Sequence, residues 1–151
     1  MTLNEKLKIP ASAWVVVADG RKALVLRNQG DEVFPNLQVQ QVYEAPPNPA
    51  TREQGSDKPP RAIYGGRRSA IEQTDWHELA ERRFAEEVAA VLERMHRDAP
   101  LGTLIIVAPP RALADLRKAL SDEVKRTIVA EIDKDLTKHP VYEIESHLTD
   151  A

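Results

Sequence analysis

The chain has 151 residues, a length that fits one domain with a single hydrophobic core. Its charged content of 30% and formal net charge of -3 give no global basic field, so a nucleic acid would have to be bound by a local patch. The absence of cysteine excludes disulfides, thiolate metal sites and cysteine nucleophiles, and it is compatible with a reducing compartment.

The N-terminal third predicts three strands. Residues 1–12 contain lysines but no apolar signal-peptide core, and the chain has no run of eighteen apolar residues, so we expect a cytoplasmic protein without a membrane span. Residues 14–18 and 23–26 are apolar runs separated by Asp19-Gly20, which predicts a tight β-hairpin near the sheet centre. Residues 33–44 alternate loosely and include Pro35, which indicates a third strand with an exposed edge or a bulge.

Residues 45–74 form a polar, proline-rich segment that we expect to be a long loop. It carries five basic residues against three acidic ones, and it includes the string YGGRR at positions 64–68. Connections longer than about a dozen residues are uncommon in compact domains unless they bind something or are disordered. This segment is therefore the expected working surface of the protein.

A long amphipathic helix is expected directly after this loop. Thr74 or Asp75 is suited to cap its first amides, and Glu78 is placed for a capping box with Asp75. Apolar residues then recur at helical spacing, and they are Trp76, Ala80, Phe84, Val88, Leu92 and Met95.

The last third predicts alternating strands and helices. Residues 104–108 read as a strand covered on both faces, residues 112–120 and 121–125 as helices, and residues 128–132 as the last strand. Pro140 is expected to open a final amphipathic helix. The order predicts an α/β fold, a mixed β-sheet covered by helices, in one domain spanning residues 1–151.

Four segments together resemble the bacterial host attachment protein family. Their order and spacing extend the similarity over nearly the whole chain, and the segments are WVVVADGRKA (14–23), RFA (83–85), LIIVAP (104–109) and EIDKDLT (131–137). The family takes its name from a role proposed in bacterial attachment to host cells. The resemblance implies membership of that family.

The same layout is similar to the middle domain of archaeal and eukaryotic peptide-chain release factors. That domain has an RNase H-like fold in which a mobile loop before a long helix carries a Gly-Gly-Gln tripeptide. Here Gly65-Gly66-Arg67 stands at the comparable place, and arginine cannot supply the glutamine amide. The resemblance therefore implies an RNase H-like domain that acts on or near the ribosome without catalysing peptide release.

We expect the loop to bind structured RNA or the ribosome without catalysis. Glycines let the backbone approach phosphates, and guanidinium groups pair with phosphates or stack on bases. The expected RNA-binding residues are Arg61, Tyr64, Gly65, Gly66, Arg67, Arg68 and, in the first turn of the predicted helix, His77.

Three other interpretations remain open at this point. The glycine-arginine string is also compatible with a flexible solvated loop, and residues 46–60 offer an extended segment for a protein partner in attachment or surface regulation. Asp19, Asp133 and Asp135 would suit a metal-dependent nuclease if they gathered, although Asp-Gly is equally typical of a hairpin turn. No nucleotide-binding glycine motif and no histidine pair at zinc-ligand spacing occurs, so we expect no cofactor and no metal.

Overall fold

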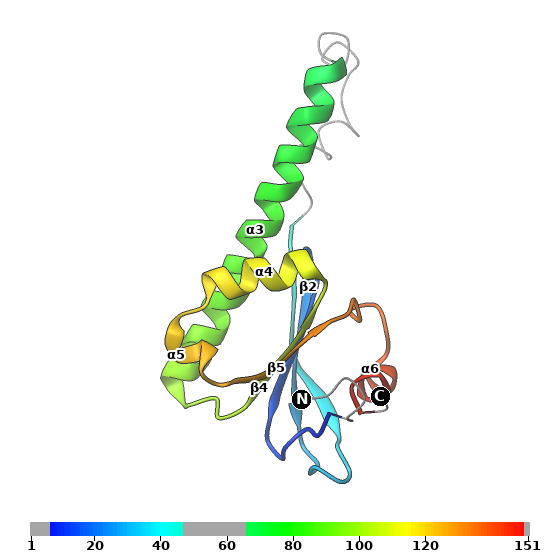
Figure 1. Cartoon of the computed structure of the whole chain (residues 1–151), viewed down its shortest axis with the longest axis vertical. Helices are drawn as coiled ribbons and strands as arrows, with labels where there is room; N and C mark the ends of the chain where they lie inside the picture. The colour runs from blue at the N-terminus through cyan, green and yellow to red at the C-terminus, as the bar shows by residue number, and fades with distance from the viewer. Residues whose placement is uncertain (1–6, 47–65, 150–151) are drawn as a thin grey trace.

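A computed structural model describes the backbone of residues 7–46 and 66–149, and the side chains of residues 7–46 and 76–149. Its centre is a five-stranded sheet of order β3-β2-β1-β4-β5 (Figure 1). The strands are β1 (Trp14–Ala18), β2 (Lys22–Asn28), β3 (Leu37–Glu44), β4 (Leu104–Ala108) and β5 (Ile128–Asp133). Strand β2 is antiparallel to β1 and β3, whereas β4 is parallel to β1 and β5. The mixed sheet expected from the sequence is confirmed.

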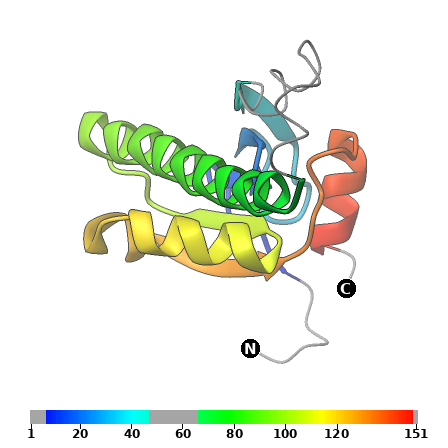
Figure 2. The ribbon, with the colours of Figure 1, turned by 90° about the horizontal axis from the view of Figure 1, so that it is seen from above.

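Helices lie on both faces of this sheet. Helix α3 (Gly66–Asp98), helix α4 (Pro110–Ala119) and the short helix α5 (Asp122–Lys125) cover one face. Helix α6 (Val141–Thr149) covers the other face, as the view from above shows (Figure 2). The α/β class predicted from the order of elements is therefore correct.

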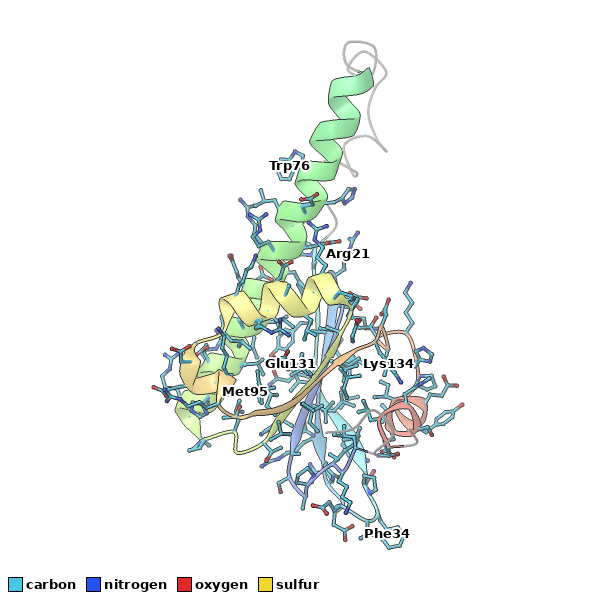
Figure 3. All side chains as sticks on the ribbon, viewed as in Figure 1. Arg21, Phe34, Trp76, Met95, Glu131 and Lys134 are labelled. Atoms are coloured by element: carbon cyan, nitrogen blue, oxygen red, sulfur yellow. The ribbon has the colours of Figure 1, made fainter. Side chains whose placement is uncertain are left out.

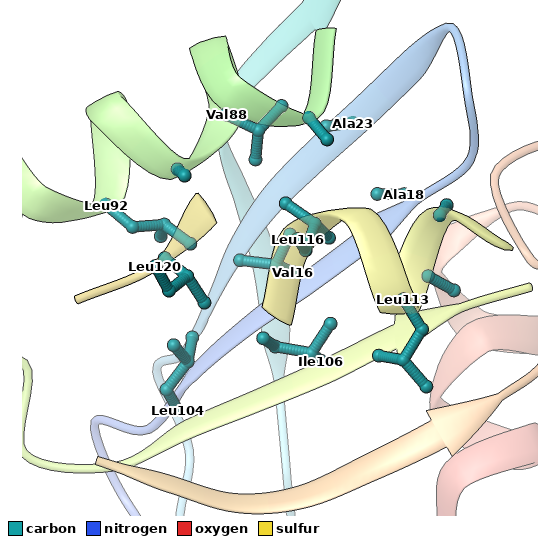
Figure 4. Close-up of a cluster of buried hydrophobic side chains, with 14 of the residues drawn as sticks. Val16, Ala18, Ala23, Val88, Leu92, Leu104, Ile106, Leu113, Leu116 and Leu120 are labelled. Carbon is teal, nitrogen blue, oxygen red and sulfur yellow. The ribbon is translucent and has the colours of Figure 1, made fainter. Parts of the chain in front are cut away.

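Two apolar clusters, one on each face, hold the layers together. Alternate residues of β1 enter opposite clusters, so Val16 packs toward α3 and α4 while Val15 and Val17 pack toward α6. Figure 4 shows Leu92 of α3 and Leu116 of α4 in the same cluster over the strands. All five residues of β4 are buried, which confirms that this strand is covered on both faces.

The connection between β2 and β3 depends on one buried amide side chain. Asn28 is 1% exposed, and its Oδ1 accepts hydrogen bonds from the amides of Gly30 at 2.9 Å and Asn36 at 2.8 Å. Its amide nitrogen donates to the carbonyls of Ile9 at 2.9 Å, Pro10 at 3.0 Å and Asp31 at 3.2 Å. A single side chain thus joins the segment before β1 to both ends of the β2–β3 loop.

Strand β3 begins later than the sequence suggested. Residues 33 and 34 belong to a turn in which Asp31 Oδ1 accepts hydrogen bonds from the amides of Val33 and Phe34. The strand starts at Leu37, after Pro35. The expected exposed edge and bulge are both present, because β3 ends the sheet and its register with β2 shifts opposite Val25 and Leu26, leaving Gln40 as the extra residue.

Helix α3 begins earlier than the sequence suggested. It starts at Gly66, so the predicted loop end at Thr74 and the capping box of Asp75 with Glu78 are wrong. Residues 69–73, SAIEQ, contain neither glycine nor proline and include several good helix formers, so the helix extends through them. The low apolar content of this stretch is also typical of a loop, so the sequence pattern did not distinguish the start of the helix from the segment before it.

Candidate functional site

The expected RNA-binding segment coincides with the beginning of helix α3. Gly66, Arg67 and Arg68 form its first turn, so they are helical and not part of a loop. Arg61, Tyr64 and Gly65 lie outside the described residues. His77 is exposed, three helical turns further along the same helix.

The first half of α3 projects from the body of the molecule (Figure 1). The first buried residue of its described side chains is Phe84, followed by Ala85, Val88 and Leu92. Trp76 was expected on the packed face of the helix, but its side chain is 41% exposed and extends from the projecting part (Figure 3). The buried face therefore begins two turns later than the apolar pattern indicated.

A polar hollow of about 470 Å³ lies at the base of this projection, where β1 ends. Its walls come from the β1–β2 turn, the end of β3, the middle of α3 and the segment after β5. Its lining residues are Asp19, Gly20, Arg21, Lys22, Glu44, Ala45, Glu81, Thr137 and Lys138. The carboxyl ends of parallel strands are a common place for ligands in open α/β sheets.

The hollow is organised by Asp19. Its Oδ1 accepts hydrogen bonds from the amides of Arg21 and Lys22, each at 2.7 Å, which is the local bonding that an aspartate provides in a tight turn. Its Oδ2 accepts a hydrogen bond from the hydroxyl of Thr137 at 2.7 Å. The side chain of Asp19 therefore fixes the hairpin and also ties it to the segment after β5.

Thr137 is a residue of this site that sequence reasoning missed. It is 2% exposed, and its hydroxyl also lies 3.3 Å from Oδ1 of Asp135. A buried hydroxyl with a carboxylate partner 118 positions away leaves no local pattern in the chain.

The aspartate cluster considered for a nuclease does not form a metal site. Asp19 and Asp135 share the hydroxyl of Thr137, and Oδ1 of Asp19 is occupied by two amides. Within residues 7–46 and 76–149, no three histidine or carboxylate side chains come close enough to hold a metal ion. The geometry gives no support to two-metal phosphodiester hydrolysis.

Ion pairs link α3 to α4 beside the hollow. Arg111 Nη2 lies 3.0 Å from Glu78 Oε1, and its Nε lies 3.9 Å from Glu81 Oε1. Glu81 also lies directly over Gly20, where an added Cβ would come within 2.8 Å of its side chain. Glu81 thus closes the hollow on the helix side.

The lining charges of the hollow cancel. Three basic side chains, Arg21, Lys22 and Lys138, face three carboxylates, Asp19, Glu44 and Glu81. A phosphate would meet as many repulsive as attractive charges there.

Comparison with known proteins gives one family. The family described as "Protein required for attachment to host cells" matches residues 14–148, which is nearly the whole chain. The chain belongs to this host attachment family. The four segments that suggested the resemblance all lie inside the match, and the expectation of family membership is confirmed.

No curated protein matches this host attachment family member. Across the helices that the structure describes, none is long and apolar enough to cross a membrane.

Proposed function

We propose that this host attachment family member is a non-catalytic RNA-binding module that acts on or near the ribosome in the cytoplasm. In this proposal the chain is one RNase H-like domain, similar in arrangement to the release factor middle domain. The sheet order supports the assignment, since an antiparallel β1-β2-β3 unit is extended by the parallel strands β4 and β5 through helical crossovers. The proposed contact residues are Arg61, Tyr64, Gly65, Gly66, Arg67, Arg68 and His77.

The observation that carries the proposal is the composition of the first turn of α3. It contains Arg67 and Arg68 and no acidic residue. The first amides of a helix lack intrahelical partners, and the helix dipole makes this end positive, so anions are favoured there even without basic side chains. Two adjacent arginines add guanidinium groups that pair with phosphate oxygens.

The position of this turn also supports RNA contact. Phe84, the first buried residue of α3 with a described side chain, lies eighteen positions after Gly66. At 1.5 Å per residue the first turn stands about 27 Å along the helix from the packed part. A projecting cationic tip of this kind is suited to reach between the phosphate backbones of a large RNA.

The proposal is restricted to binding. The Gly-Gly-Arg string lacks the glutamine that the release factor tripeptide uses, and the hollow at the end of β1 presents balanced charge and engaged carboxylates. We therefore expect neither peptidyl-tRNA hydrolysis nor RNA cleavage by the purified protein.

The test compares two double variants that remove the same charge from opposite ends of one helix. Arg67→Ala/Arg68→Ala removes the tip arginines, whereas Arg94→Ala/Arg97→Ala removes two exposed arginines near the end of α3. Co-sedimentation with ribosomes, measured over a salt series, is expected to weaken only for the first variant. Removing one arginine that pairs with a phosphate lowers the slope of log affinity against log salt by about 1.

Two results would contradict this assignment. If both variants bound ribosomes as the parent chain does, the tip would have no part in binding. If both weakened binding equally, the effect would come from net charge and not from the first turn of α3.

A second candidate function is a protein-interaction factor in attachment. The family description favours it, and so do exposed apolar side chains at the margins of the molecule, including Val33, Phe34 and Val129. The proline-rich segment considered for such a partner lies outside the described residues from position 47 onward. A pull-down with and without ribonuclease separates the two functions, because a protein partner survives the nuclease and an RNA-bridged partner does not.

A further inference from the structure

The outer edge of β3 is a pairing surface of unusual composition. β3 is the last strand of the sheet, and no described element pairs with its free side. Every residue from Gln38 to Val42 is exposed, including Val39 at 41% and Val42 at 50%. Edge strands in soluble proteins are commonly protected by charge, proline or a covering element.

The two edges of the sheet differ in this protection. β5, at the other edge, carries the acidic residues Glu131 and Asp133. β3 carries no charge and no proline between Leu37 and Tyr43, and its protection is limited to the bulge at Gln40 and to the carboxylate of Glu145 at its first residue. Of the two edge strands, β3 is therefore the better suited to pair with another strand.

Hydrogen bonds at the two ends of β3 show which of its peptide groups point away from β2. Ala45 donates its amide to the carbonyl of Arg21 at 2.7 Å, and Asn36 accepts from the amide of Gln29 at 2.8 Å, so both residues face β2. Peptide groups alternate in direction along an antiparallel strand. If this alternation is followed from each end of β3 to the bulge, the peptide groups of Val39 and Val42 point away from β2.

The same bulge places these two valines on one face. Val39 lies opposite Leu26 and Val42 lies opposite Leu24, and both leucines belong to the cluster under α6. Without the extra residue Gln40, positions 39 and 42 would lie on opposite faces because side chains alternate along a strand.

We propose that β3 pairs antiparallel with β3 of a second copy of this chain, about a two-fold axis between Gln40 and Gln41. This register sets Val39 opposite Val42 of the second copy, and the symmetry repeats the pair. Both members of each pair have outward peptide groups and share a face, as an antiparallel ladder requires. Four main-chain hydrogen bonds join the copies in this arrangement.

The side chains of β3 are complementary to themselves in the same register. Gln40 meets Gln41 of the second copy. The amide nitrogen of Gln40 donates to the carbonyl of Gln38, and the amide oxygen of Gln41 accepts from the hydroxyl of Tyr43, so the complementary groups are the amide nitrogen of Gln41 and the amide oxygen of Gln40. Gln38 lies opposite Tyr43, and no charged residue faces another within positions 38–43. A second copy thus meets no charge repulsion across the paired residues, and two valine pairs become covered.

Helix α6 limits the ladder at both ends, because the two-fold axis repeats one contact of this helix. The amide of Leu37 also points outward, and it donates to Oε2 of Glu145 at 2.7 Å. This carboxylate occupies the donor that would otherwise extend the pairing to Glu44 of the second copy. The proposed interface is therefore confined to positions 38–43.

The decisive experiment is a charge-swap pair measured by sedimentation. The parent chain is expected to show a concentration-dependent monomer–dimer equilibrium. Val39→Lys/Val42→Lys and Val39→Glu/Val42→Glu each place like charges opposite one another twice, and each is expected to weaken self-association by about tenfold or more. Mixing the two variants sets lysine opposite glutamate at both pairs, and a heterodimer is expected to form.

The absence of cysteine allows an independent check of the register. Val39→Cys mixed with Val42→Cys is expected to give a disulfide-linked heterodimer under mild oxidation. Val39→Cys alone is expected to remain unlinked, because the two copies of position 39 would be three residues apart along the strands, about 10 Å. Val129→Cys, exposed on the opposite edge, is the matched control.

Three outcomes would overturn the proposal. The first is a parent chain that stays monomeric at the highest concentration measured. The second is a dimer that neither like-charge variant weakens. The third is a pair of weakened variants that fails to associate on mixing although circular dichroism shows both folded, which would mean that the substitutions act on something other than this pairing.

Discussion

Replacing Asn28 by alanine tests whether one side chain holds the start of the sheet together. The variant removes five hydrogen bonds to backbone groups at distances of 2.8 to 3.2 Å. Two of the groups are the amides of Gly30 and Asn36, which lose the acceptor that binds them, and three are carbonyls, which water can solvate where they are only partly buried.

The expected cost follows from the two amides. A buried donor left without a partner costs about 1–3 kcal/mol, and a partly buried one lies near the lower end of that range. The two amides and the three lost hydrogen bonds to carbonyls together are expected to lower the free energy of unfolding by about 3 kcal/mol. For a domain of this size, that lowers the melting temperature by about 6–12 °C.

The assay is thermal and urea unfolding monitored by circular dichroism, with Gln29→Ala as the control. Gln29 is exposed in the same loop, and its side chain has no hydrogen bond to the described residues, so its removal is expected to change stability by less than about 0.5 kcal/mol. If Asn28→Ala unfolded within about 2 °C of the parent chain, the amide network would carry little of the stability assigned to it.

Two further substitutions test contacts between distant parts of the chain. Thr137→Val keeps the shape of the side chain but removes the hydroxyl that donates to Asp19 Oδ2, so we expect the free energy of unfolding to fall by about 1.5–3 kcal/mol. Thr137→Ser retains the hydroxyl, so we expect a smaller loss. Equal losses for the two variants in urea unfolding would refute the role of this hydrogen bond. Glu93→Ala removes the carboxylate that accepts hydrogen bonds from the amide and hydroxyl of Ser121 at 2.7 and 2.8 Å, and we expect the free energy of unfolding to fall by about 1 kcal/mol. Glu87→Ala, exposed on the same helix, is the control and is expected to have little effect. A Glu93 variant as stable as this control would contradict a stabilising contact between Glu93 and Ser121.

The parts of the fold that the sequence predicted correctly have short-range causes. The β1–β2 hairpin follows from a β-branched run and an aliphatic run on either side of the turn at Asp19-Gly20. Helix α5 follows from Ser121, whose hydroxyl accepts a hydrogen bond from the amide of Val124. The burial of β4 follows from five consecutive apolar residues. Periodicity and local capping are sufficient for each of these.

The predicted start of α3 was wrong because the apolar pattern in the sequence indicates which residues are buried, and not where a helix begins. Residues 66–74 have the propensity for a helix but no apolar stripe, so the pattern located the packed part of α3 and not its beginning. Trp76 was placed on the packed face for the same reason, and its 41% exposure shows that an aromatic residue in helical register need not be in the core.

Tertiary contacts of polar side chains could not be predicted from the sequence. Thr137 meets Asp19, and Glu145 meets the amide of Leu37 108 positions away. Each depends on where the whole sheet brings its ends together. The RNA-binding residues predicted from the YGGRR string remain a proposal, now attached to a helix terminus in place of a loop.

The burial of β1 and β4 on both faces has a consequence for how this family can diversify. The interior is set by short aliphatic runs in the two middle strands, and almost any polar change there would cost the fold itself. Strand β3, by contrast, is exposed from Gln38 to Val42 and contributes little to the interior. Sequence change is therefore expected to be tolerated along the edge strand β3 and to be rejected in β1 and β4.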